Sequence, residues 1–228
     1  PASACNKRVP GSGCDALGGE NRNHAVLGWS EACIATHPSD FCVPLAALDA
    51  VVEIEGASGP RSVPMADFHL LPGDTPERET VLAPGDLIVA VRLPAAAADF
   101  AAHSRYVKVR ERTSYAFALV SAAAALRLEG GRIAEARLAL GSVAAKPWRV
   151  AAAEQALLGA APTADAFARA ADLAVEGAKP SGDNGFKIDL ARRIAVRALM
   201  RAAAGTPERL PPLPASPHAT VAGEVTHV

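Results

Sequence analysis

Four cysteines, whose side chains can bind a soft metal or form disulfides, lie close together near the start of the sequence. They are Cys5, Cys14, Cys33 and Cys42, and the remaining 186 residues contain none. The intervals between them hold eight, eighteen and eight residues. These intervals are wider than those of paired C-x-x-C zinc motifs or of the tight cysteine run in bacterial ferredoxins. The cysteines therefore indicate a shared thiolate site or two disulfides, without a motif that identifies a metal.

Length and composition favour one thiolate site over disulfides. With 228 residues, half of them apolar, the chain can bury ordinary cores without covalent cross-links. A disulfide framework would be expected to spread through such a chain, whereas these cysteines occupy its first fifth. Zinc is one metal that four cysteines can hold in a closed site.

Charge and hydropathy exclude two classes of partner. A net charge of -1 and a pI near 6.7 provide no basic face for a phosphate backbone, so no nucleic acid is expected. The longest largely apolar stretch, Ala116–Leu126, falls well short of the roughly 20 residues that cross a bilayer, so no membrane span is expected. The sequence begins at Pro1 without a methionine or a recognisable signal peptide. We therefore expect a fragment or a processed product.

The cysteine-rich segment has little periodicity, so other elements must position it. Residues 1–38 contain many glycines and are predicted to form an irregular loop. Ser39 or Asp40 can cap a short helix whose first turn contains Cys42. A strand over Val51–Glu55 follows, with alternate residues on one face. The later elements expected in this half are a turn over Gly56–Pro60 and an extended segment over Asp86–Leu93.

An alanine-rich stretch over Ala95–Ala102 precedes a second unit with a new pattern. After Pro147 the apolar period changes from two to 3.6 and predicts three helices, while the prolines after Thr206 predict an extended tail. The strands predicted before these helices are Arg105–Arg110, Ala118–Leu128 and Ile133–Leu140, the last two joined by a turn over Glu129–Gly131. We predict an α+β fold with units at residues 1–100 and 101–205 and a tail at 206–228.

Several short segments permit a closer identification. Residues 22–28 (RNHAVLG) and 36–40 (THPSD) resemble the FAD-binding subunits of the xanthine dehydrogenase and carbon monoxide dehydrogenase family. Residues 81–88, 106–110 and 140–144 agree with that family in order and spacing. The resemblance implies the later part of a PCMH-type FAD-binding domain with an iron–sulfur loop at residues 5–42. A domain of a three-stranded antiparallel sheet plus three helices would follow it.

The cysteine loop resembles that of one subgroup within this family. It is similar to the insert in the FAD subunit of bacterial heterotrimeric molybdenum aldehyde oxidoreductases, which carry an additional [4Fe-4S] cluster. The resemblance implies that Cys5, Cys14, Cys33 and Cys42 hold one such cluster. Two alternatives remain open for the fourth ligand, because Cys42 lies on the expected helix and could be a buried core thiol, with the fourth ligand upstream of Pro1.

The resemblance also implies a set of flavin contacts. Asp40 would hydrogen-bond the sugar-like chain of the flavin, and Lys108 would place a positive charge near its ring system. From the residues alone, Asp40 is equally well a helix cap and Lys108 an exposed strand lysine. No glycine-rich phosphate loop is present, so we expect the later two thirds of a subunit that alone binds FAD weakly. The full set of predicted contacts is Val26, Leu27, Gly28, Ser30, Asp40, Ile88 and Lys108.

The implied function is that of an electron-transfer FAD/[4Fe-4S] subunit of a molybdenum-dependent aldehyde oxidoreductase. Aldehyde oxidation would occur at a molybdenum cofactor in a large partner subunit. Electrons would pass through [2Fe-2S] clusters of a small partner to FAD and an external acceptor. The alternative from another class is a structural or binding module with a four-cysteine zinc site and no redox role. The compartment stays open between periplasm, by export with a partner, and cytoplasm.

Two other groups of residues have plainer interpretations. The histidines show no paired spacing of the HExxH kind, so no catalytic histidine–metal site is predicted. Basic residues on the last helix predict a solvated face or a subunit contact. The histidines include His24, His37, His69 and His103, and the basic residues of the last helix are Arg192, Arg193, Arg197 and Arg201.

Overall fold

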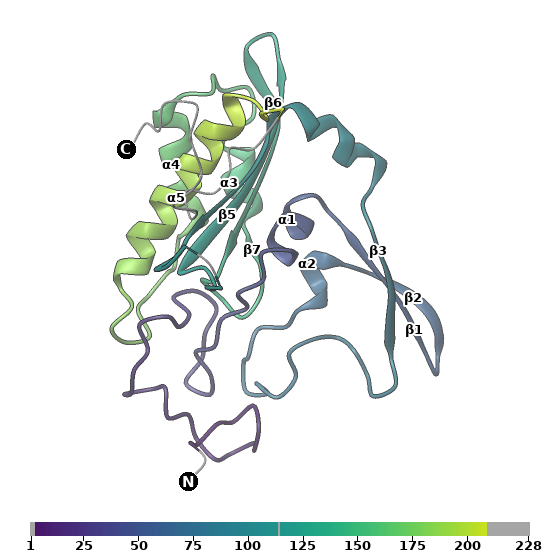
Figure 1. Ribbon diagram of the computed structural model, residues 1–228, viewed down its shortest axis with the longest axis vertical. Coiled ribbons are helices and arrows are strands. Elements are labelled where there is room, and N and C mark those ends of the chain that lie inside the picture. Colours follow the sequence, from purple (N-terminus) through teal and green to yellow (C-terminus); the bar gives the residue numbers. More distant parts are fainter. Residues whose placement is uncertain (1–2, 114, 209–228) are drawn as a thin grey trace.

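Two antiparallel sheets form the framework of the computed structural model, which describes residues 3–113 and 115–208. One sheet has the strand order β2-β1-β3 and the other β4-β5-β6-β7. Helix α1 lies between the two sheets, and helices α3, α4 and α5 cover the opposite face of the larger sheet (Figure 1). The cysteine-rich N-terminal loop, purple in Figure 1, lies near one end of the larger sheet. The predicted mixed α and β architecture is confirmed.

The N-terminal half contains the predicted short helix and first strand. Val52 and Ile54 are each 1% exposed on one face of β1, as the alternation predicted. The turn after β1 covers only positions 57–58, because a second strand, β2, begins at Gly59. This strand was not predicted, since its sequence GPRSVP carries turn-forming residues at both ends. The elements are α1 (Cys42–Ala47), β1 (Val51–Gly56), β2 (Gly59–Pro64), α2 (Met65–Phe68) and β3 (Leu87–Arg92).

Strand β3 confirms the predicted extended segment but has no buried face. It pairs with β1 at the edge of the smaller sheet, and all six of its residues are exposed. Leu87 is 64% and Val89 is 47% exposed. The side chains of β3 alternate between two faces, and both faces are exposed to solvent.

The C-terminal sheet has four strands, where the sequence predicted three. The additional strand, β7 (Trp148–Arg149), pairs with the end of β6 and is too short to give a periodic signal. Gly130 and Gly131 turn the β5–β6 hairpin at φ of +56° and +76°, as that turn requires. The alanine-rich stretch forms a 3-10 helix, η1 (Ala95–His103), which leads into the sheet. The other strands are β4 (Ser104–Val109), β5 (Val120–Glu129) and β6 (Arg132–Gly141).

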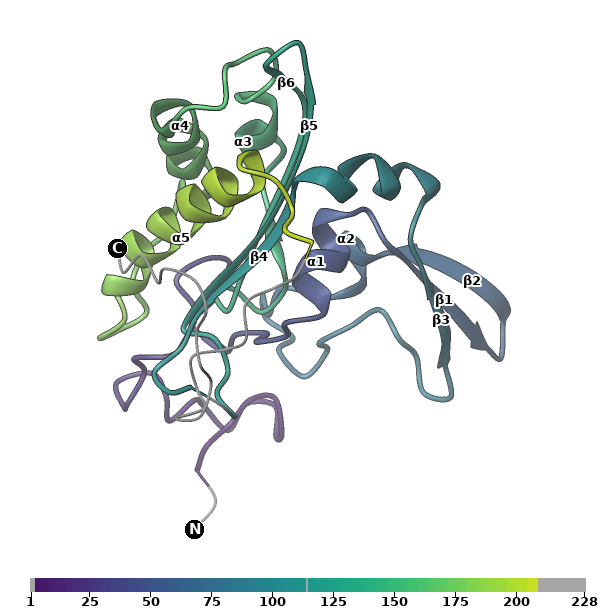
Figure 2. The ribbon, with the colours of Figure 1, turned by 45° about the horizontal axis from the view of Figure 1, so that its top comes forward.

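Strand β5 is the centre of the molecule because its small residues allow close packing on both faces. Ala122 and Ala124 belong to the large core that the helices complete, whereas Ala123 packs against Val43 and Ala47 of α1. Figure 2 shows this sandwich, with α5 on one side of the sheet and α1 on the other. Helix α1 thereby joins the cysteine-bearing half of the chain to the C-terminal half.

The three predicted C-terminal helices are confirmed. They are α3 (Ala151–Gln155), α4 (Ala164–Ala174) and α5 (Phe186–Ala203). The Thr163 side chain accepts a hydrogen bond from the Ala166 amide and caps α4. Within the described ranges, no helix combines the length and apolar character needed to cross a bilayer. Most of the predicted tail, residues 209–228, lies outside the described residues.

One charged side chain of α5 is completely buried. The ammonium of Lys187 donates to the backbone oxygens of Asn23, His24 and Ser142 at 3.0, 2.9 and 2.6 Å. Three carbonyls match the three N–H donors of a charged lysine. Burial lowers the pKa of Lys187 from 10.5 to about 8, so the group is still mostly charged at neutral pH. This lysine fastens the loop at residues 23–24 to the end of β6 and to α5.

We expect this depressed pKa to be visible in the pH dependence of stability. Between about pH 8 and 10.5 the unfolded chain keeps the Lys187 proton while the folded chain releases it. The contribution of this group to the free energy of unfolding therefore rises with pH across that window. A titration of lysine 13Cε chemical shifts checks the prediction. One resonance should titrate near 8, and a set in which every lysine titrates near 10.4 would contradict it.

Candidate functional site

An ion pair between the two halves of the chain marks the first part of the site. The N-cap position of α1 is Phe41, and the Ser39 hydroxyl just before it accepts hydrogen bonds from the Phe41 and Cys42 amides at 3.3 and 3.1 Å. The Asp40 carboxylate instead accepts from the Lys108 ammonium at 2.5 Å and from the Tyr106 hydroxyl at 2.6 Å. The segment before α1 and strand β4 thus bring together two residues that the family resemblance predicted as neighbours of one ligand.

Tyr106 is a site residue that the sequence did not predict. It shares a face of β4 with Lys108, two residues away, so strand periodicity could have found it. Burial and then the nearby Asp40 carboxylate raise the pKa of Tyr106, which therefore keeps its proton and donates to Asp40. The Asp40 carboxylate is still half exposed after accepting both bonds, and it retains acceptor capacity for a ligand.

This ion pair lines an open cavity of about 760 Å³. One wall comes from the segment before α1 and the other from β4 and the loop after it. Tyr115 and Phe117 on that loop are 95% and 76% exposed. The cavity therefore combines a carboxylate and basic groups with aromatic rings, which suits an elongated polar ligand with a flat ring. The lining residues are His37, Pro38, Ser39, Asp40, Phe41, Lys108, Arg110, Tyr115, Ala116 and Phe117.

Residues 26–30, which were predicted to contact the flavin, are fixed by burial and by hydrogen bonds within the chain. Val26 and Leu27 are buried in the main core, and both amides donate to the Val143 oxygen, at 2.9 and 3.0 Å. Gly28 has a φ of +60°, and an added Cβ would lie 2.7 Å from Leu71 Cδ2. Position 28 therefore requires a glycine because the Leu71 side chain leaves no room for a Cβ atom. The Ser30 hydroxyl donates to the Gly73 oxygen at 2.7 Å.

Ile88, the remaining predicted contact, lies on the exposed strand β3 and is 43% exposed. It does not belong to the lining of the cavity around Asp40 and Lys108. The structure therefore joins two of the seven predicted flavin residues in one cavity, Asp40 and Lys108.

Three of the four cysteines lie on mutually linked loops. Cys5 and Cys14 face each other in an isolated antiparallel bridge. The Asn6 side chain donates to the Ala32 oxygen at 2.9 Å, which ties this bridge to the segment that carries the buried Cys33. Backbone donation from Arg8 lowers the pKa of the Cys5 thiol. All four thiols are free, so the structure contains no disulfide among them.

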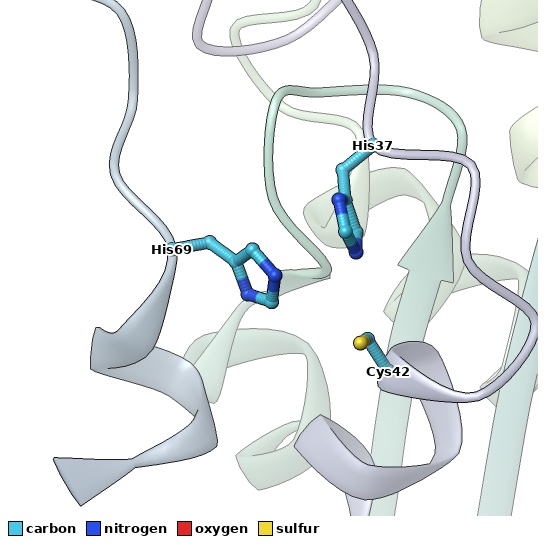
Figure 3. A group of neighbouring side chains, drawn as sticks. All are labelled: His37, Cys42 and His69. Atoms are coloured by element: carbon cyan, nitrogen blue, oxygen red, sulfur yellow. The ribbon is translucent and has the colours of Figure 1, made fainter. Parts of the chain in front are cut away.

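Cys42 has different neighbours from the other cysteines. Its sulfur and one ring nitrogen each of His37 and His69 lie within 4.8 Å of one another (Figure 3). Within residues 3–113 and 115–208, no other cluster of three or more His, Cys, Asp or Glu ligand atoms is this close. The prediction that the histidines build no metal site missed this group, because 32 positions separate the two histidines and only the fold joins them.

Both imidazoles in this group are neutral at physiological pH. Burial, followed by the nearby His37 and Lys146, lowers the pKa of His69 to about 4. Burial also lowers the pKa of His37, with a smaller effect of Lys7. The two ring centroids are 4.1 Å apart. Neutral imidazole is the form that binds metal ions.

Comparisons with known proteins find two family models that match successive parts of the chain. Residues 16–96 match the FAD binding domain in molybdopterin dehydrogenase, and residues 105–203 match the CO dehydrogenase flavoprotein C-terminal domain. The chain belongs to the FAD-binding medium subunits of the xanthine and carbon monoxide dehydrogenase family. The Asp40–Lys108 cavity of this family member lies where its two matched domains meet.

Curated relatives of the chain include an FAD-binding subunit and a medium chain. The chain is 49% identical over 201 residues to the aldehyde oxidoreductase FAD-binding subunit PaoB of Escherichia coli (strain K12), covering 88% of this chain and 59% of that protein. It is 30% identical over 185 residues to the carbon monoxide dehydrogenase medium chain of Hydrogenophaga pseudoflava, covering 78% and 60%. The chain thus spans about three fifths of the length of these relatives.

Solved structures of the family share the fold. Quinoline 2-oxidoreductase from Pseudomonas putida 86 matches with a TM-score of 0.60 at 30% identity, over 82% of this chain and 60% of that one. Carbon monoxide dehydrogenase from Hydrogenophaga pseudoflava matches with a TM-score of 0.62 at 30% identity, over 88% and 64%. This chain therefore shares its fold with part of each of these structures.

Proposed function

We propose that this chain is part of the electron-transfer subunit of a molybdenum-dependent aldehyde oxidoreductase and holds FAD and a [4Fe-4S] cluster. The 49% identity to the aldehyde oxidoreductase subunit PaoB over 88% of this chain carries the proposal. The proposed partners are a large subunit with the molybdenum cofactor and a small subunit with [2Fe-2S] clusters. An external acceptor would take up the electrons.

The cavity at Asp40 and Lys108 is the proposed place of the flavin. FAD, when bound, would supply the change between two-electron and one-electron chemistry. The half-exposed Asp40 carboxylate can accept hydrogen bonds from hydroxyl groups of the ribityl chain, while Tyr106 and Lys108 hold it in position. Lys108 places a positive charge in a largely covered position, where it would favour a negatively charged ring system.

The cysteine loop is the proposed place of the cluster. Cys5, Cys14 and Cys33 supply free thiols on linked loops, and the fourth ligand is Cys42 or a residue outside this sequence. Ligands of a cubane sit on separate iron atoms, so their sulfurs need not gather as closely as the ligands of one ion. Thiolates are the usual ligands of such clusters, and the thiol set of this loop fits them.

Iron and sulfide analysis of the anaerobically purified intact subunit tests this proposal. We expect about four iron and four sulfide ions per chain, with a broad visible absorption beyond that of FAD. Cys14→Ser and Cys33→Ser should lose most of the iron and sulfide together, because each removes one thiolate from the cluster.

Val9→Ser is the matched control, since Val9 is an exposed residue of the same loop. It should keep the iron and sulfide of the wild type. A wild-type protein that contains zinc at the cysteines and no acid-labile sulfide would refute the electron-transfer role of this loop and support the structural zinc module instead.

A further inference from the structure

A second kind of ligand set gathers beside the cysteine loop. His37 belongs to the segment before α1, Cys42 is the first residue of α1, and His69 follows α2 directly. Figure 3 shows the three side chains directed from these separate elements toward one space. Their ligand atoms lie within 4.8 Å of one another. A tetrahedral zinc site with these ligand types would need separations of about 3.5 Å, so small side-chain rotations bring them to one ion.

Each of the two histidines has a buried ring nitrogen without a hydrogen-bond partner. His69 is only 6% exposed, and its Nδ1 atom has no hydrogen-bond partner. The Nε2 atom of His37 is likewise buried without a partner. A buried polar atom left unpaired is destabilising, and most such atoms in folded proteins are satisfied. A bound metal ion would satisfy nitrogen lone pairs that the chain itself leaves unused.

The donor set selects the kind of metal. Two imidazole nitrogens and one thiolate sulfur suit zinc, which accepts three protein ligands with an open fourth position. A cavity of about 160 Å³ that His37 and His69 line provides space for water at that position. Lys7 and Lys146 lie near the histidines, but Lys7 pairs with Glu79, and metal binding by Cys42 as a thiolate would add negative charge.

We propose that His37, Cys42 and His69 bind a single zinc ion that is separate from the iron–sulfur cluster. The site joins the segment before α1 to α1 and to the residue after α2. Asp40 lies between His37 and Cys42 in the sequence, so the ion also fixes the segment that carries the carboxylate of the proposed flavin cavity. This assignment removes Cys42 from the cluster, whose fourth ligand is then another residue.

Elemental analysis of the intact subunit, expressed in medium with both iron and zinc, tests the proposal. The wild type should contain about one zinc ion per chain together with its iron. Cys42→Ser and His69→Gln should each lower zinc at least fivefold and leave iron and sulfide unchanged. His103→Gln is the control, because His103 contacts the Ala202 oxygen instead of this group, and it should retain zinc.

Cobalt replacement supplies a measurement that does not depend on how the variants fold. Wild-type protein produced with Co²⁺ in place of zinc should show a thiolate-to-cobalt absorption band in the near ultraviolet and tetrahedral bands in the visible. Absence of both zinc and these bands from the wild type would overturn the proposal. So would loss of iron and sulfide from Cys42→Ser with zinc retained, since that result assigns Cys42 to the cluster.

Discussion

Replacement of Lys187 by methionine is expected to lower the free energy of unfolding by about 3–5 kcal/mol. Methionine keeps much of the volume of the lysine but donates no hydrogen bond. The backbone oxygens of Asn23 and Ser142 would then lose the Lys187 donor, and the His24 oxygen would keep only the donation from the Asn184 side chain. Urea unfolding followed by circular dichroism measures the loss.

Arg193→Met on the same helix is the matched control for this variant. Its side chain is 75% exposed and pairs with Asp189 one turn away, so the change should cost about 0.5 kcal/mol or less. Equal unfolding midpoints for the two variants would show that Lys187 does not join the loop at residues 23–24 to the helix.

Asp40→Asn in the intact subunit is expected to weaken FAD binding by roughly 10- to 100-fold, the loss for a hydrogen bond to a charged group. The amide keeps the shape of the side chain but loses the charge that Lys108 and Tyr106 now orient. Lys108→Met should weaken binding in the same direction, because it releases the Asp40 carboxylate and removes a positive charge from the cavity. Fluorescence titration of FAD into the apoprotein measures both effects.

Asp67→Asn serves as the control for flavin binding. Asp67 is an exposed carboxylate in the first turn of α2, outside the lining of the cavity, and its replacement should leave FAD affinity unchanged. Wild-type affinity in both Asp40→Asn and Lys108→Met would place the flavin elsewhere. Thermal melting of each variant separates a loss of affinity from a loss of folding.

The sequence predicted elements whose signals are local. The β5–β6 hairpin has two adjacent glycines between apolar runs, and β1 alternates clearly, so both were found. Strand β2 and the two-residue strand β7 lack such signals, because their strand conformation comes from the neighbours with which they pair. The family resemblance supplied Asp40 and Lys108 as neighbours of one ligand, which neither residue type nor spacing could have done.

The residues that were missed depend on contacts between distant segments. Lys187 has the sequence context of an ordinary helix lysine, and its burial follows only from the loop that covers it. His37 and His69 carry no spacing motif, and they meet because α2 folds back toward the segment before α1. Side chains that act through long-range contacts give no periodic signal in a single sequence.

The run of small residues in β5 has a consequence for the conformational entropy of folding. Ala122, Ala123, Ala124 and Ala125 have no side-chain rotamers to lose, so the strand that separates α1 from α5 is buried without that entropic cost. The same feature limits how the sequence can change, because a larger side chain at Ala123 would push against α1 and one at Ala124 against the helical core. We therefore expect small residues at positions 123 and 124 in variants of this chain that keep the packing of α1 and the helices on β5.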